Sequence, residues 1–62
     1  MTTQEKKQLL DEIEKATRDA ASNDVTVNNS WKYGYLTGLR KAAEIAGITS
    51  HEEKEAISKG LA

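Results

Sequence analysis

The sequence contains no cysteine, no proline and no phenylalanine, and only one histidine. Without cysteine the chain cannot form disulfides, thiolate zinc sites or a cysteine nucleophile. A single histidine cannot build a histidine-rich metal cluster, and no set of nucleophile, base and orienting group can be assembled from these residues. The absences predict a protein that is not an enzyme and that needs no cofactor or metal.

Long hydrophobic runs and an excess of charge of one sign are also missing. No apolar stretch approaches the roughly 18 residues that a transmembrane helix needs. The first residues lead into a charged amphipathic segment instead of the apolar stretch of a signal peptide. Nine basic and ten acidic residues give a net charge of −1. We therefore expect a cytoplasmic protein that binds no membrane.

The apolar residues of the chain are mostly small. Eight of them are alanine, and leucine, isoleucine and valine together contribute only eleven of the 62 residues. A chain this short forms one domain, residues 1–62, and buries a smaller share of its surface than a larger domain does. We expect a marginally stable monomer that a protein partner or a second copy would stabilise.

Residues 3–22 have the periodicity of an amphipathic helix. Thr2 and Glu5 have the spacing of a capping box at its start. Apolar and small residues then recur at intervals of three and four, which places them on one face. This face comprises Leu9, Leu10, Ile13, Ala16, Thr17, Ala20 and Ala21.

Residues 24–35 allow two interpretations. Segments 25–27 and 31–35 alternate like strands, and the polar residues between them could form the turn of a β-hairpin. Alternatively, Asn29 or Ser30 caps a helix that starts at Trp31 and ends before Gly47, a typical residue after a helix C-terminus. The helix is favoured because one unbroken stripe at helical spacing contains Trp31, Tyr35, Gly38, Leu39, Ala42, Ile45 and Ala46.

Residues 50–59 begin with Ser50 and Glu53 at the spacing of a second capping box, with acidic side chains in the first turn. The sequence therefore predicts an all-α fold. Two antiparallel helices form a hairpin with a loop at 23–30, and a short third helix follows Gly47. The alternative is an α+β fold with a small β-hairpin at 25–35.

Gly34, Gly38, Ala42 and Ala46 are spaced four residues apart and would form a straight groove of small side chains along a helix. Each glycine inside a helix costs about 1 kcal/mol relative to alanine, which suggests a packing reason for two of them. Either the 3–22 helix lies in this groove, or a second copy or another protein does.

All three aromatic residues fall within five positions, at Trp31, Tyr33 and Tyr35. On a helix, Trp31 and Tyr35 share a face and are expected to fill the thin core, whereas Tyr33 points the opposite way. Tryptophan, tyrosine and arginine are enriched in interface hot spots, so Tyr33 together with Lys32 and Arg40 is the predicted basic–aromatic contact patch. The predicted protein interface, which combines the aromatics with the small residues, comprises Trp31, Lys32, Tyr33, Gly34, Tyr35, Gly38, Arg40 and Ala42.

Residues 42–57 partly resemble the helix-turn-helix motif of phage and bacterial repressors. Ala43, Gly47 and Ile48 match its small, turn-glycine and apolar positions, and Ala56 matches a later apolar position. Glu53 stands where that family has a buried apolar residue, and segment 51–55 carries three acidic residues, which would repel phosphate. The resemblance implies a small DNA-associated regulator, which is the alternative function.

The order of features, a charged first helix followed by the aromatic and glycine-rich segment 31–47, is similar in style to small accessory proteins of bacteriophages and mobile elements. That resemblance implies a regulator or inhibitor that binds a host protein. We therefore expect a non-catalytic protein–protein interaction module. Its partner is a host or cognate protein and not nucleic acid, and a homodimer is expected. A structural subunit of a homo-oligomer is a further alternative.

Overall fold

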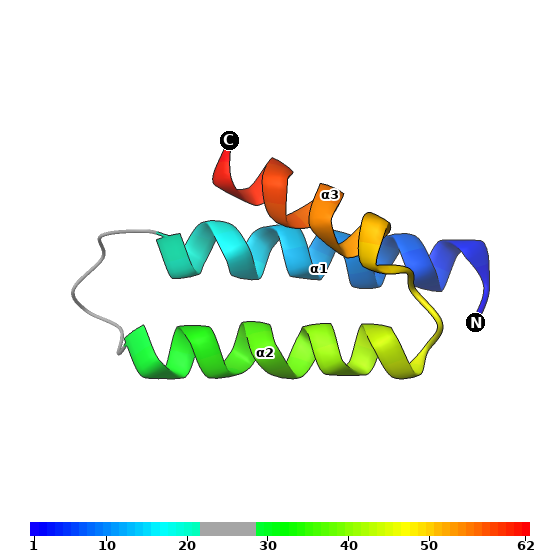
Figure 1. The fold of residues 1–62 in the computed structure, drawn as a ribbon, viewed down its shortest axis with the longest axis horizontal. Helices are drawn as coiled ribbons and strands as arrows, with labels where there is room; N and C mark the ends of the chain where they lie inside the picture. Colours follow the sequence, from blue (N-terminus) through cyan, green and yellow to red (C-terminus); the bar gives the residue numbers. More distant parts are fainter. Residues whose placement is uncertain (22–28) are drawn as a thin grey trace.

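A computed structural model describes residues 1–21 and 29–62, which fold into three helices (Figure 1). α1 spans Thr3–Ala21, α2 spans Asn29–Ile45 and α3 spans Ser50–Leu61. α1 and α2 lie antiparallel, and α3 also packs on α1 with little contact to α2. The predicted all-α hairpin with a third helix is confirmed. None of these helices is long and apolar enough to span a membrane within the residues described.

The alternative of a β-hairpin at 25–35 is wrong where it can be compared, because residues 29–35 are helical. Its first part, residues 25–28, lies outside the described residues. The expected loop at 23–30 is also too long at its end, since α2 already begins at residue 29. The helical pattern therefore outweighs the short alternation of aromatic residues in this segment.

Capping side chains fix the starts of α1 and α3. At α1 the predicted box is present, with the Glu5 amide donating to Thr2 Oγ1 at 3.1 Å and the Thr2 amide donating to Glu5 Oε1 at 3.0 Å. At α3 the predicted cap, Ser50, is wrong by one residue. Thr49 is the N-cap, and its Oγ1 accepts from the Glu52 amide at 3.2 Å.

Gly47 ends α2 as predicted. Its φ of 90° is the left-handed conformation that glycine adopts without strain. The Gly47 amide donates to the Glu44 carbonyl at 3.1 Å, and the Ile48 amide donates to the Ala43 carbonyl at 3.0 Å. This pair of bonds is a Schellman motif. The turn directs Ile48 into the core, where it is buried.

The core is small, as the apolar content predicts. Ile13 is the one large side chain that is fully buried in residues 1–21 and 29–62. Buried Ala43, Ile48 and Ala56 surround it, and partly buried residues complete the cluster, namely Leu9, Leu10, Leu36, Leu39 and Ile57. The side of α2 that faces α1 is therefore the side that carries Leu36, Leu39 and Ala43.

The predicted packing face of α2 is consequently wrong. Trp31 and Tyr35 do not fill the core, and α1 does not lie in the groove of small residues. A Cβ built on Gly34 or on Gly38 would meet no atom within 4 Å. The side of α2 that carries the leucines packs on α1, because burying leucine side chains removes far more apolar surface from water than burying glycines does.

The close helix contact in this fold involves Gly60 of α3. A Cβ at this position would lie 2.5 Å from the Glu14 carbonyl oxygen and 2.7 Å from Thr17 Cβ. Nearby, Arg18 Nη2 donates to the Lys59 carbonyl at 3.2 Å and approaches Glu14 Oε2 at 3.3 Å. Glycine at position 60 therefore allows α3 to approach the backbone of α1.

Candidate protein-binding face

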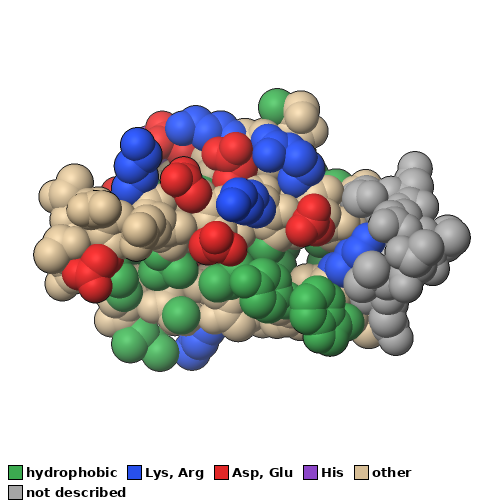
Figure 2. Space-filling model, turned by 180° about the vertical axis from the view of Figure 1, so that it is seen from behind, with side chains coloured by type: hydrophobic (Ala, Val, Ile, Leu, Met, Phe, Trp, Pro, Cys, Tyr) green, Lys and Arg blue, Asp and Glu red, His purple; other side chains and the backbone are tan. Residues whose placement is uncertain are grey.

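The side of α2 turned away from the core carries large apolar residues that no other described element covers. We define the α2 outer face as Trp31, Gly34, Tyr35, Gly38, Lys41, Ala42 and Ile45, all of which are exposed. Trp31 is 63% exposed, Tyr35 46% and Ile45 80%. Figure 2 shows hydrophobic side chains gathered along the α2 side of the molecule, next to a band of mixed charges. A near-continuous apolar strip of this kind is a mark of an interaction surface.

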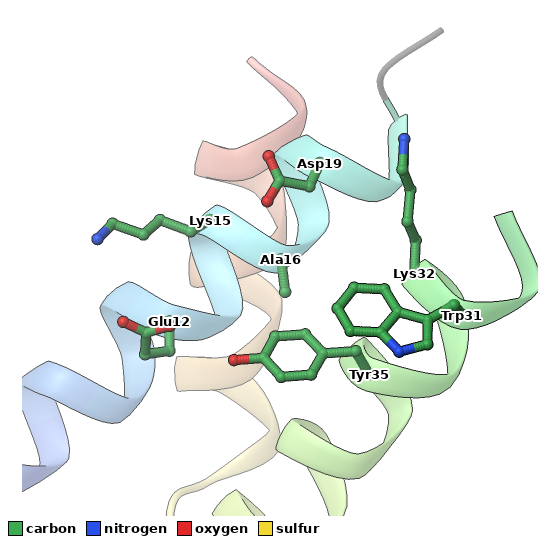
Figure 3. Close-up of a pocket in the computed structure, with 7 residues that line it drawn as sticks. All are labelled: Glu12, Lys15, Ala16, Asp19, Trp31, Lys32 and Tyr35. Carbon is green, nitrogen blue, oxygen red and sulfur yellow. The ribbon is translucent and has the colours of Figure 1, made fainter. Parts of the chain in front are cut away.

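Trp31 and Tyr35 form one end of the α2 outer face. They are one helical turn apart, and their rings stack with centroids 5.6 Å apart and planes 4° from parallel. Both rings project toward Ala16 of α1, and the Tyr35 hydroxyl points toward Glu12 (Figure 3). The stacked pair therefore forms an aromatic ledge beside α1, and stacking of the two rings lowers the side-chain entropy that would be lost on binding.

An open cleft of about 270 Å³ lies between this ledge and α1. Its lining comprises Glu12, Lys15, Ala16, Asp19, Trp31, Lys32 and Tyr35. The charged groups of α1 at its rim have both signs, and Lys15 points away from the rings (Figure 3). The cleft is large enough for one or two apolar side chains of a partner, and its rim could pair with charges of either sign.

The predicted interface residues lie in three different environments: the α2 outer face, another exposed side of α2, and contacts between helices. Trp31, Gly34, Tyr35, Gly38 and Ala42 share the α2 outer face. Tyr33 is 57% exposed but lies on another side of the helix, where its carbonyl accepts a hydrogen bond from Thr37 Oγ1 at 2.8 Å.

Lys32 and Arg40 do not form an exposed patch with Tyr33. Lys32 is only 6% exposed and lies between the helices. Arg40 reaches α3, where its Nε lies 3.4 Å from Oε1 of Glu53. The predicted basic–aromatic contact patch is therefore not assembled, because only its tyrosine faces solvent without a tertiary contact.

Sequence reasoning missed Ile45 as a site residue, although it is the most exposed large apolar side chain of α2. The pattern contained a signal. Ile45 lies seven positions after Gly38, and Trp31 lies seven positions before Gly38. Two helical turns separate each from Gly38, so all three point in nearly the same direction.

The acidic start of α3 is largely engaged in the fold. Glu53 is 3% exposed and pairs with Arg40. Glu52 Oε2 lies 2.6 Å from Lys6 Nζ. This hydrogen bond with Lys6 lowers the pKa of the Glu52 carboxyl, and the bond from the Thr49 amide lowers it further. The remaining exposed surface of α3 carries His51, Lys54, Glu55, Ser58 and Lys59.

The described ranges, 1–21 and 29–62, contain no group of three or more histidine, aspartate or glutamate side chains placed to hold a metal ion. His51 is exposed, and its Nε2 lies 3.3 Å from Oε1 of Glu55. No protein-family model, no curated protein and no solved structure gives a significant match to this chain. Among the described surfaces, the α2 outer face combines exposed large apolar side chains with an adjoining cleft.

Proposed function

We propose that this protein is a non-catalytic protein–protein interaction module that binds its partner through the α2 outer face. The observation that carries the proposal is the exposure of Trp31, Tyr35 and Ile45 along a helix whose opposite side is already packed on α1. A strip of exposed apolar side chains lowers the solubility of a protein. A partner that covers the strip removes this apolar surface from water, which contributes favourable binding free energy.

The shape of the strip favours a helix as the binding element of the partner. Gly34, Gly38 and Ala42 keep the middle of the strip low, while Trp31 and Ile45 rise at its two ends. A helix can lie along such a shallow groove and pack its side chains between the end residues. The aromatic pair would act as the anchor, since tryptophan and tyrosine dominate binding hot spots.

A module of this kind acts by occupying a surface of its partner. Its effect is therefore regulation or inhibition of a host or cognate protein, without chemistry of its own. The mixed charges of α1 beside the strip would supply a polar rim, which sets orientation and partner choice more than affinity.

The test is affinity capture from a bacterial lysate with matched variants. Trp31→Glu and Ile45→Glu place a charge on the α2 outer face, and Tyr33→Glu places the same charge on another exposed side of α2. Proteins retained by the parent chain and by Tyr33→Glu are expected to be lost from the two face variants. The same captured proteins on all four chains would contradict the proposal.

A DNA-associated regulator is the second candidate, and the α2–α3 turn is the observation that favours it. The positions matching the helix-turn-helix family are buried, namely Ala43, Ile48 and Ala56, and Gly47 has the left-handed conformation. Glu53 is buried as well, at the family's apolar position. With Glu52 and Glu53 engaged, α3 presents two lysines and one glutamate on its exposed surface. Salt-dependent retardation of DNA in a gel would support this candidate, and no retardation at low salt would exclude it.

A further inference from the structure

We infer that the α2 outer face pairs with the same face of a second copy, with the two α2 helices antiparallel and crossing at Gly38. The inference rests on the proposed function in taking the α2 outer face as the binding surface. It names a second copy as the occupant, so that a host protein binding this face would compete with self-pairing. It is carried by the exposed apolar side chains of the face, by their symmetric order about Gly38 and by the placement of its one charge.

The order of residues is symmetric about Gly38. Trp31 and Ile45 lie seven positions before and after it, and Gly34 and Ala42 lie four positions before and after it. At about 100° per residue, all four project within about 40° of the direction of Gly38. Two large residues, Trp31 and Ile45, therefore lie at equal distances on either side of a central segment of small residues.

This symmetry suits a two-fold axis. An antiparallel pair about Gly38 brings position 38 − n of one helix to the level of position 38 + n of the other. Each Trp31 then faces Ile45 of the second copy, and each Gly34 lies level with Ala42 of the second copy. Large side chains meet at the two ends, while small residues let the helix backbones approach at the centre. The same patch serves both copies, as an isologous dimer requires.

The one charge of the α2 outer face selects the antiparallel arrangement. Lys41 is the only charged residue among the seven of the α2 outer face, and Glu44 lines the shallow cleft beside it at the edge of that face. A parallel pair in register would place Lys41 beside Lys41 of the second copy. The antiparallel pair separates these cations by about 9 Å along the axis and places the stem of Lys41 beside Gly34 of the second copy. It also opposes the two helix dipoles favourably.

The size of the strip sets the expected strength of the pairing. From Trp31 to Ile45 it runs about 21 Å along the helix. A contact of that length lies near the lower limit of specific interfaces, about 1,000 Å² in total. We therefore expect a dissociation constant on the order of micromolar. Because Ile13 is the only large side chain fully buried among the described residues, this pairing would also raise the stability of the fold with protein concentration.

The first experiment is sedimentation equilibrium over a wide concentration range. The parent chain is expected to pass from monomer to dimer, and Tyr33→Glu is expected to do the same. Trp31→Glu and Ile45→Glu should each weaken dimerisation by about tenfold or more, with unchanged helical circular dichroism showing that they still fold. A parent chain that stays monomeric at every concentration would overturn the inference, and so would a dimer that Ile45→Glu leaves intact.

The second experiment tests the register and uses the absence of native cysteine. A mixture of Gly34→Cys and Ala42→Cys chains should form mixed dimers with a short thiol cross-linker. Ala42→Cys alone should not, because the two thiols would lie about 12 Å apart along the axis. Efficient cross-linking of Ala42→Cys to itself would establish a parallel pair and overturn the antiparallel register.

These outcomes separate the inference from the proposed function. A monomeric parent chain whose captured partners depend on Trp31 and Ile45 would overturn self-pairing and leave the interaction module in place. A dimer with the expected register whose face variants capture the same lysate proteins as the parent would support self-pairing and overturn binding of a host protein through this face.

Discussion

Gly60 of α3 lies against Thr17 of α1, so close that a Cβ at position 60 would stand 2.7 Å from Thr17 Cβ and 3.0 Å from Thr17 Cγ2. The Thr17 hydroxyl donates to the Ile13 carbonyl at 2.8 Å, which turns its methyl group toward α3. Thr17 is itself buried. This contact is where a small residue is required for helix packing.

We expect Gly60→Ala to destabilise the protein. The added methyl group collides with the Glu14 carbonyl oxygen at 2.5 Å, and backbone cannot move aside as a flexible side chain could. The strain of about 1–3 kcal/mol outweighs the helix propensity that alanine adds. Chemical denaturation followed by circular dichroism measures the loss in free energy of unfolding.

Gly34→Ala is the matched control and should act in the opposite direction. A Cβ at position 34 meets nothing within 4 Å, so the helix gains about 0.5–1 kcal/mol of propensity without a clash. The measurement is made in dilute solution, well below the micromolar range in which self-pairing is expected. A gain in stability for Gly60→Ala as large as that for Gly34→Ala would show that neither glycine is under packing constraint.

The N-cap of α3 gives a second paired prediction. Thr49→Ala removes the acceptor of the Glu52 amide and the anchor of the capping box, and should cost about 1 kcal/mol. Ser50→Ala changes the first helical residue, which is exposed, and should cost less than about 0.5 kcal/mol. Thermal unfolding compares the two variants. A larger loss for Ser50→Ala would place the cap at the residue that the sequence pattern first suggests.

Features decided by neighbouring residues could be predicted from this sequence. The box of Thr2 and Glu5, the turn at Gly47 and the helical period of α1 and α2 depend on contacts within about one helical turn. The N-cap of α3 could not be fixed, because Thr49 and Ser50 are each followed three residues later by a glutamate. The choice coincides with a tertiary contact, since Glu53 turns inward to Arg40 and Glu52 remains for the cap.

The orientation of α2 could not be predicted for a related reason. Two stripes at helical spacing run along it, one through Trp31, Gly38 and Ile45 and the other through Leu36 and Ala43. Helical periodicity alone gives no reason to prefer one stripe over the other as the side that packs on α1. The fold selects the second because it meets Leu9, Leu10 and Ile13 of α1 and Ile48 beyond the turn. For this reason, the residues expected in the core became the candidate binding face.

The pair of Arg40 and Glu53 should contribute to stability through the buried carboxylate. Glu53 is 3% exposed, whereas Arg40 is largely at the surface. Arg40→Met leaves the buried charge without this partner, and we expect a loss of about 1–3 kcal/mol. The double variant Arg40→Met with Glu53→Leu should recover part of it, because leucine needs no partner there. Lys54→Met, which removes an exposed cation, is the control and should change stability by less than about 0.5 kcal/mol. A double variant no more stable than Arg40→Met would contradict this account.

The carboxylates of Glu5 and Glu52 should make the fold sensitive to acid. The hydrogen bond from the Thr2 amide lowers the pKa of Glu5, and the contact with Lys6 is the first cause of the lowered pKa of Glu52. A carboxyl with a lower pKa in the folded state binds fewer protons there than in the unfolded state. Its contribution to stability is therefore complete above its ordinary pKa and is lost as the pH falls through the folded value.

Glu52→Gln tests this linkage, because glutamine keeps an oxygen for the capping bond and loses the titrating charge. The melting temperature of the parent chain should fall as the pH drops below about 4.5, the ordinary pKa of glutamate. The variant should start from a lower melting temperature at neutral pH and decline less steeply in acid. Glu44→Gln, at an exposed position of α2, serves as the control and should follow the parent curve. Parallel curves for the parent and Glu52→Gln would mean that the contact between Lys6 and Glu52 does not contribute to folding.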